Sequence, residues 1–260
     1  MDAFVKRNPE APPGFFACEA AGLRWLAAAD GGAACARVLG HDETSLTLER
    51  LSSVAPNRQA AHGFGRSLAR THDAGAEAFG AAPENWSGPG YFGPLHSPLP
   101  MSLTGHPTWG GFYAAERLSP MAELAGPRLR PDVATAVQRV ITRCERGDFD
   151  DGDRPARLHG DLWSGNVMWT SAGVVLIDPA AHGGHRETDL AMLALFGCPL
   201  LAAVIDGYQT EQSLLAGWRG RVGLHQLYPL LAHVVLFDGG YAEQAGAAAR
   251  SALAVPQVRS

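Results

Sequence analysis

Three polar side chains in a fixed order constrain this 260-residue chain most: Asp161, Asn166 and Asp178. Asp161 and Asn166 lie in the segment LHGDLWSGN, and Asp178 ends the segment VVLID twelve residues after Asn166. Phosphoryl transfer to a hydroxyl group requires a carboxylate that orients the acceptor and oxygen ligands that hold magnesium beside the phosphates. The order and spacing therefore predict Asp161 as the catalytic base and Asn166 with Asp178 as magnesium ligands.

The residues between Asn166 and Asp178 have the pattern of a β-hairpin. Residues 167–169 and 174–177 are apolar runs typical of strands, and residues 171–173 (SAG) are typical of a turn. Such a hairpin would carry both predicted magnesium ligands to the same edge, facing one cleft. Each residue alone is more often a helix cap or turn residue, so the prediction depends on the combination.

Four longer segments extend the pattern over nearly the whole chain. They are FFACEAAGL at 15–23, LHGDLWSGN at 158–166, DPAAHGGHRETDLAMLALFG at 178–197 and GWRGRVGLHQLYPLLAHVVLFDGGY at 217–241. Together they resemble the fructosamine kinase family, also called ketosamine 3-kinases, which has a protein-kinase-like fold related to aminoglycoside and choline phosphotransferases. The resemblance implies an α+β fold of two lobes, a small N-terminal lobe and a large, mainly helical C-terminal lobe.

The resemblance also implies the division of the chain. Residues 1–52 would form a partial N-lobe, and residues 53–260 a C-lobe with the catalytic loop and the substrate site. In kinase-type folds the nucleotide lysine lies on the third strand, after a hairpin with the glycine-rich loop. Only five residues precede Lys6. We therefore expect the N-lobe to be truncated, without its first hairpin.

Nucleotide-binding roles follow from the same resemblance. Lys6 would pair with the phosphates of ATP, Glu19 would fix that lysine, and Leu48 and Glu49 would offer hinge backbone groups to adenine. The periodicity agrees in part, because Glu19 shares the apolar face of a helix predicted over residues 15–29 and an inward glutamate needs a cation. The alternative is that Lys6 is solvated near the terminus and Glu19 is a partly exposed helix residue.

Five further residues have roles implied by the resemblance. His159 would brace the catalytic loop, and Asp189 would anchor it. Trp163 would form an apolar wall for the sugar, although a packing role is equally compatible. Arg186 and Glu187 would reach substrate hydroxyls or pair with each other, while a glutamate at a helix start is also what the helix dipole alone favours.

The rest of the chain is predicted from its periodicity. Residues 75–109, rich in Gly, Pro and Ser, predict a long ordered loop whose Trp86 and Trp109 line the acceptor pocket or anchor the loop on the core. The acidic stretch 148–153 predicts a solvated turn. Helices are predicted over residues 59–72, 112–124, 131–146, 187–196, 200–208, 211–218 and 224–237.

Composition limits the partners. A net charge of -5 and a pI of about 6.0 give no electrostatic footprint for nucleic acid or an anionic membrane. The four scattered cysteines, the lack of a signal-peptide pattern and the lack of a long apolar run predict a reduced, cytoplasmic protein. The partner is then a small molecule or a glycated amine, and the sequence leaves the oligomeric state open.

The leading hypothesis is an ATP- and Mg²⁺-dependent kinase that phosphorylates the sugar 3-hydroxyl of a ketosamine, which leads to deglycation of the amine. A second hypothesis keeps the fold but changes the acceptor to an aminoglycoside, choline or a similar alcohol. A third, of a different class, is a non-catalytic binding module without a nucleotide lid. The retention of Lys6, Glu19, Asp161, Asn166 and Asp178 together argues against the third.

Overall fold

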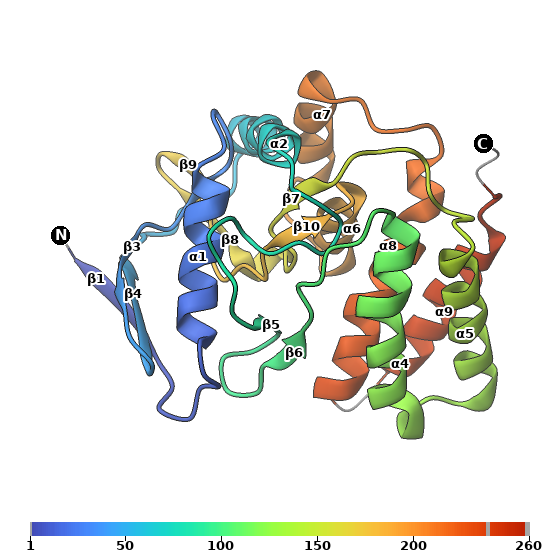
Figure 1. The fold of residues 1–260 in the computed structure, drawn as a ribbon. Coiled ribbons are helices and arrows are strands. Elements are labelled where there is room, and N and C mark those ends of the chain that lie inside the picture. Colours follow the sequence, from blue (N-terminus) through green and yellow to red (C-terminus); the bar gives the residue numbers. More distant parts are fainter. Residues whose placement is uncertain (1, 238–239, 258–260) are drawn as a thin grey trace.

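The computed structural model describes residues 2–237 and 240–257. A small lobe, formed by an antiparallel sheet and one long helix, lies beside a larger and mainly helical body (Figure 1). The part of the chain that joins them, residues 50–57, has no regular secondary structure. None of the helices in the described ranges is both long enough and apolar enough to cross a membrane.

The small lobe is built on three strands in the order β1 (Ala3–Arg7), β4 (Ser45–Glu49) and β3 (Val38–His41). The central strand β4 alternates between buried and half-buried side chains, so Leu46 and Leu48 point to one face. Helix α1 (Phe15–Ala27) covers that face with a stripe of apolar side chains, which include Phe16 and Leu23. The packing of the inward β4 side chains against the apolar stripe of α1 holds the small lobe together.

The predicted hairpin joins the two lobes. Strands β8 (Val167–Thr170) and β9 (Gly173–Leu176) pair antiparallel around a two-residue turn, and β2 (Ala34–Cys35) adds to β9 in parallel. The short strands β7 (Ala156–Leu158) and β10 (His182–Gly184) form a separate antiparallel pair. The chain enters and leaves the hairpin at Asn166 and Ile177, where the Ile177 amide donates to the Asn166 carbonyl oxygen at 3.1 Å.

Helices make up most of the large lobe. One core lies where α2 crosses α7 and contacts the hairpin, and a second, larger core lies among α4, α5, α8 and α9 (Figure 1). The elements not yet bounded are α2 (Arg58–Asp73), β5 (Gly90–Phe92), β6 (Leu99–Met101), α3 (Trp109–Phe112), a π-helical segment (Tyr113–Leu118), α4 (Ser119–Ala125), a 3₁₀ turn (Gly126–Arg128), α5 (Pro131–Glu145), a 3₁₀ turn (Ser164–Asn166), α6 (Glu187–Leu195), α7 (Leu201–Glu211), α8 (Trp218–Leu236) and α9 (Tyr241–Ala254).

Two expectations about secondary structure were wrong, and one helix was missed. The helix predicted over residues 211–218 is absent, because α7 runs through Glu211 and the chain turns at Gly217 in the left-handed region (φ 79°) before α8 begins. Residues 75–109 are not only a loop, because β5 and β6 form a two-stranded sheet within them. Helix α9 was not predicted, because its alanine and glycine residues give a weak apolar pattern.

Helices α2 and α7 pack closely because each has a glycine at the crossing point. A methyl group at Gly65 would overlap the Val204 carbonyl oxygen, and one at Gly207 would overlap the His62 carbonyl oxygen. The two backbones therefore meet where a side chain cannot fit.

We expect Gly65→Ala to lower the free energy of unfolding by about 1–3 kcal/mol, because α7 must move away from α2. Gly63 lies in the same helix with open space at its Cβ position, so Gly63→Ala should stabilise the protein by about 0.5–1 kcal/mol through helix propensity. Urea unfolding of both variants measures the difference. Equal effects of the two substitutions would contradict the proposed close packing.

Candidate active site

Five of the residues singled out in the sequence line one cavity between the two lobes. Lys6 comes from β1 and Glu19 from α1, whereas Asp161, Asn166 and Asp178 come from the catalytic loop and the ends of the hairpin. The cavity has a volume of about 400 Å³. This is within the size range of pockets that enclose small-molecule ligands.

The side chain of Asn166 ties the catalytic loop to the far end of the hairpin. Its Nδ2 donates to the Asp161 carbonyl oxygen at 2.7 Å, to Asp161 Oδ2 at 3.3 Å and to the Asp178 carbonyl oxygen at 3.4 Å. These bonds fix the amide orientation and leave Oδ1 without a protein partner among the described residues. Asn166 therefore presents an oxygen atom, the ligand type that magnesium prefers.

Asp178 holds its carboxylate in the cavity through an unusual backbone conformation. Its φ angle is 56°, a left-handed value that is uncommon outside glycine and frequent at functional sites. The side chain is 41% exposed, and Oδ1 lies 3.1 Å from Lys6 Nζ. The carboxylate is therefore open to a ligand while its direction is fixed.

Lys6 and Glu19 form a buried ion pair. Lys6 Nζ donates to Glu19 Oε1 at 2.9 Å and Oε2 at 2.7 Å, with the two side chains only 9% and 6% exposed. Although burial lowers the pKa of Lys6, the charges of Glu19 and Asp178 raise it above its usual value, so the ammonium stays charged. The alternative of a solvated Lys6 and an exposed Glu19 is wrong.

Asp189, near the start of α6, binds the backbone of the catalytic loop. Its carboxylate accepts hydrogen bonds from the backbone amides of His159 at 2.8 Å and Gly160 at 3.0 Å, and lies 3.1 Å from His72 Nε2. Burial would raise the pKa of Asp189, but the bonds from His72 and the loop hold it below its usual value. The charged carboxylate thus occupies the position expected of an anchor.

His159 connects the loop to the hairpin. Its Nε2 lies 2.9 Å from the Ile177 carbonyl oxygen, which can only accept, so the proton is on Nε2. Its Nδ1 then accepts from the Asp161 amide at 3.2 Å. Burial lowers the pKa of His159, which keeps this tautomer neutral. The geometry is that of a bracing residue rather than a proton donor.

Asp161 faces the cavity as a carboxylate of raised proton affinity. Burial raises the pKa of Asp161 to about 7; the nearby charges of Asp178 and Asp189 add to this, and the bond from Asn166 opposes it. A base with a pKa near neutrality is well matched to receiving a proton from a hydroxyl group. A carboxylate with a raised pKa, two further side chains with oxygen atoms and a buried lysine therefore converge in one cavity.

Comparison with known proteins agrees with this geometry. The family model for fructosamine kinase matches residues 1–254.

The chain belongs to the fructosamine kinase family.

The "Probable ketoamine kinase" of Synechocystis is 35% identical over 252 residues, which are 93% of this chain and 80% of that protein. The crystal structure of "putative fructosamine-3-kinase" from Thermobifida fusca is 46% identical, with a TM-score of 0.88 over 97% of this chain and 86% of that one. A ternary complex of a thermostable aminoglycoside phosphotransferase mutant with ADP and hygromycin B shares the fold, at 19% identity and a TM-score of 0.54 over 96% and 85% of the chains. The expected α+β, kinase-like fold is thereby confirmed, and the relatives support a kinase.

One wall of the cavity in this fructosamine kinase family member is aromatic. Trp163 is 40% exposed and meets the ring of Phe196 edge to face at 6.2 Å. His233 continues the wall at 4.9 Å from Phe196, followed by Phe237 and Tyr241. Sequence reasoning missed the last three residues, although their spacing of four within the segment 217–241 was a signal.

Neither tryptophan of the 75–109 region lines this cavity. Trp109 is buried and stacked on Tyr113 at 4.7 Å, so the alternative of an anchor in the core is correct for it. The Trp86 ring nitrogen donates to the Pro89 carbonyl oxygen within the same loop. The alternative that these side chains line the acceptor pocket is therefore wrong.

Arg186 and Glu187 are buried away from the cavity and do not pair with each other. Arg186 binds Asp153 at 2.6 Å and Asp73 at 2.9 Å, and Glu187 binds Arg221. The expected contact of Arg186 and Glu187 with substrate hydroxyls is therefore wrong. Both residues have a structural role, because a buried charge must be paired inside the protein. The acidic stretch 148–153 is correspondingly not simply solvated, since Asp153 completes one of these pairs.

Leu48 and Glu49 lie within β4 rather than at the cavity. The Leu48 side chain is in the core of the small lobe, and the Glu49 amide donates to the Arg37 carbonyl oxygen at 3.0 Å. Their backbone belongs to a central strand, so the expected hinge contact with adenine is misplaced. A hinge contact from this region would come from the irregular segment 50–57.

His182 packs directly against the glycine of the catalytic loop. Gly160 has φ 81°, and a methyl group there would meet the His182 ring at 2.9 Å. The His182 Nδ1 donates to the Ala180 carbonyl oxygen at 2.8 Å. Burial lowers the pKa of His182 to about 3, and the nearby Arg117 guanidinium adds to this. The folded protein therefore keeps this imidazole neutral.

We expect this histidine to make the protein less stable in mild acid. The unfolded chain takes up a proton as the pH falls below about 6.5, whereas the folded chain does so only near pH 3. The stabilisation from a neutral His182 is therefore present above pH 6.5 and is lost as the pH falls toward 3, by about 2 kcal/mol between pH 7 and pH 5. Urea unfolding at both pH values should show a smaller difference for His182→Gln than for the parent protein. An unchanged difference would contradict the assignment.

Proposed function

We propose that this protein is an ATP- and Mg²⁺-dependent kinase that phosphorylates the 3-hydroxyl group of a ketosamine. The observation that carries the proposal is the convergence of Asp161, Asn166, Asp178 and the Lys6–Glu19 pair on one cavity. No folding requirement alone brings a high-pKa carboxylate, an oriented amide oxygen and a left-handed aspartate to one place. Membership of the fructosamine kinase family supports the reaction class.

The residues present fit a nucleotide with its metal. Asn166 Oδ1 and the Asp178 carboxylate would hold magnesium, which when bound neutralises charge on the phosphates. Lys6 stays protonated, and its 3.1 Å contact with Asp178 places it beside the same ligands, where it would pair with phosphate oxygens. Glu19 keeps Lys6 directed into the cavity.

Asp161 would position the acceptor. Its carboxylate binds the substrate hydroxyl in line with the terminal phosphorus and takes the hydroxyl proton as the new oxygen–phosphorus bond forms. The bond between that phosphorus and the bridging oxygen of ADP breaks at the same time. Asp189 and His159 hold the loop backbone so that the carboxylate does not turn away.

The aromatic wall supports a sugar carrying an amine as the acceptor. Sugar rings and the methylene chain of an amine pack on flat aromatic faces such as those of Trp163 and Phe196. A protonated secondary amine is also attracted to such faces. Phosphorylation at the sugar 3-position would make the adduct decompose and release the amine, so the activity would deglycate small amines or protein lysines.

The test is a direct transfer assay. Purified protein with ATP, magnesium and fructosyl-lysine or ribulosyl-lysine should yield ADP and a 3-phosphorylated ketosamine, detected by mass spectrometry and phosphorus NMR. Turnover only with an aminoglycoside or choline would replace the proposed acceptor while leaving the kinase. Calorimetry that detects no nucleotide binding would remove the kinase and leave the binding module.

A further inference from the structure

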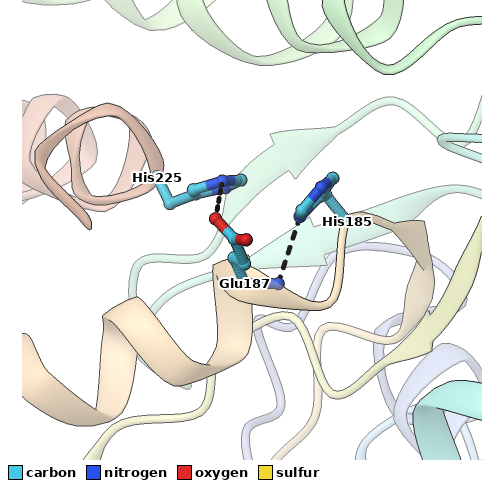
Figure 2. Close-up of side chains that lie close together, drawn as sticks. All are labelled: His185, Glu187 and His225. Carbon is cyan, nitrogen blue, oxygen red and sulfur yellow. Dashed lines mark hydrogen bonds and ion pairs between the residues drawn. The ribbon is translucent and has the colours of Figure 1, made fainter. Parts of the chain in front are cut away.

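A second polar cluster lies outside the cavity, at the start of α6. It consists of His185, Glu187 and His225, which are all buried. One nitrogen or carboxylate oxygen of each residue lies within 4.8 Å of the corresponding atoms of the other two. Figure 2 shows the two imidazole rings flanking the Glu187 carboxylate, His225 from α8 and His185 from the turn before α6.

Each imidazole is held by its outer nitrogen. His185 Nε2 lies 3.2 Å from Asp151 Oδ2, and His225 Nδ1 lies 3.0 Å from Thr188 Oγ1. Histidines that bind metals almost always donate their second N–H to a carboxylate or another polar group, which fixes the ring and its tautomer. The supporting contacts of a metal site are therefore present around both rings.

The inner nitrogens face Glu187, that of His225 its carboxylate and that of His185 its backbone amide. His185 Nδ1 accepts from the Glu187 amide at 3.2 Å, so its lone pair points at that N–H, and a bound metal ion would replace this hydrogen bond. His225 Nε2 lies 3.5 Å from Glu187 Oε2. This separation is long for a hydrogen bond but close to the roughly 3.3 Å between two ligands of a tetrahedral zinc ion.

The cluster carries more negative than positive charge. Glu187 and Asp151 are carboxylates, and Arg221 is the cation that binds Glu187 through Nε at 2.8 Å and through Nη2. Two carboxylates thus share one guanidinium in a buried site, and a cation bound beside Glu187 would balance the second carboxylate.

We propose that His185, Glu187 and His225 bind one divalent transition-metal ion of the zinc class. Two imidazole nitrogens and a carboxylate oxygen are a donor set that zinc accepts, and the burial of all three ligands is that of a structural rather than a catalytic site. Arg221 contacts both oxygens of Glu187, Oε1 through Nη2 and Oε2 through Nε, and its Nη2 lies 3.9 Å from Asp151 Oδ2. The metal would bind the second lone pair of Oε2, the oxygen that faces His225.

Such an ion would cross-link three segments of the large lobe. The ligands and their supporting residues come from the loop before β7, the start of α6 and the middle of α8. Helix α6 also carries Asp189, which holds the catalytic-loop amides. Occupancy should therefore stabilise the fold around the catalytic loop without touching the cavity.

Cobalt titration of the chelator-treated full chain tests the proposal. We expect one Co²⁺ per chain with the intense visible absorption of four- or five-coordination, and displacement of that absorption by one equivalent of Zn²⁺. Oxygen-ligand sites of the magnesium type are octahedral, and their cobalt absorption is weak. Zinc at about 100 times its Kd should raise the Tm by about 5 °C or more.

Variants locate the site. His225→Gln should lower cobalt affinity by about 100-fold or more, and Thr188→Val by about 10-fold through its effect on the His225 ring. Asp178→Asn, at the proposed magnesium site, and His41→Gln, in strand β3 of the small lobe, should keep the intense absorption. If the parent protein shows no intense cobalt absorption, the proposal is overturned, whether or not His225→Gln folds. The proposal is also overturned if Asp178→Asn loses the absorption or if His225→Gln keeps it.

Discussion

Replacing Asp161 with asparagine should lower kcat with a ketosamine by about 10³-fold and leave the fold intact. Asparagine keeps the shape of the side chain and an oxygen that can accept from Asn166, but it cannot take the hydroxyl proton. The KM for ATP should change little, because the proposed phosphate and metal ligands are other residues. Steady-state kinetics with saturating magnesium measures both constants.

Two further measurements make this prediction specific. Asp206→Asn, an exposed carboxylate on α7, should keep full activity. Asp161→Asn should also be at least as stable as the parent protein near pH 8, because it removes a half-buried carboxylate whose pKa is raised to about 7 and which faces the charges of Asp178 and Asp189. A loss of activity below tenfold would exclude Asp161 as the base, and a large drop in Tm would attribute the loss to misfolding.

The predictions that held were those in which local pattern and chemistry agree. Two short apolar runs around a turn fix the β8–β9 hairpin, and a hairpin necessarily returns its two ends to one edge. The proximity of Asn166 to Asp178 therefore followed from the sequence. The Lys6–Glu19 pair followed from the resemblance and from the need of an inward glutamate for a cation.

The predictions that failed concern partners that lie far away along the chain. Arg186 and Glu187 were predicted to reach substrate hydroxyls or to pair with each other, but their partners Asp153 and Arg221 are brought to them by the packing of the loop before β7 and of α8. Leu48 and Glu49 were placed at the hinge by the resemblance alone, and in the structure both lie within the paired strand β4. The His233–Phe237–Tyr241 wall depends on the junction of α8 with α9, and α9 itself was not predicted.

The second large effect should come from Asp189, which supports the catalytic loop without facing the substrate. Asp189→Ala removes the acceptor for the amides of His159 and Gly160 and the partner of His72, and His159 and His72 are buried. Leaving such groups unpaired should lower the free energy of unfolding by about 3–5 kcal/mol at pH 7.

Asp189→Asn is the matched variant. It keeps one acceptor oxygen but turns an NH₂ group toward a donor, so its loss of stability should be intermediate between those of the parent protein and Asp189→Ala. Urea unfolding measures both losses. Because the carboxylate positions the loop backbone, kcat should fall in both variants while nucleotide affinity changes less. If Asp189→Ala were as stable as the exposed control Asp206→Ala, the loop would be held by its other contacts, and the role assigned here to α6 as the support of Asp161 would be wrong.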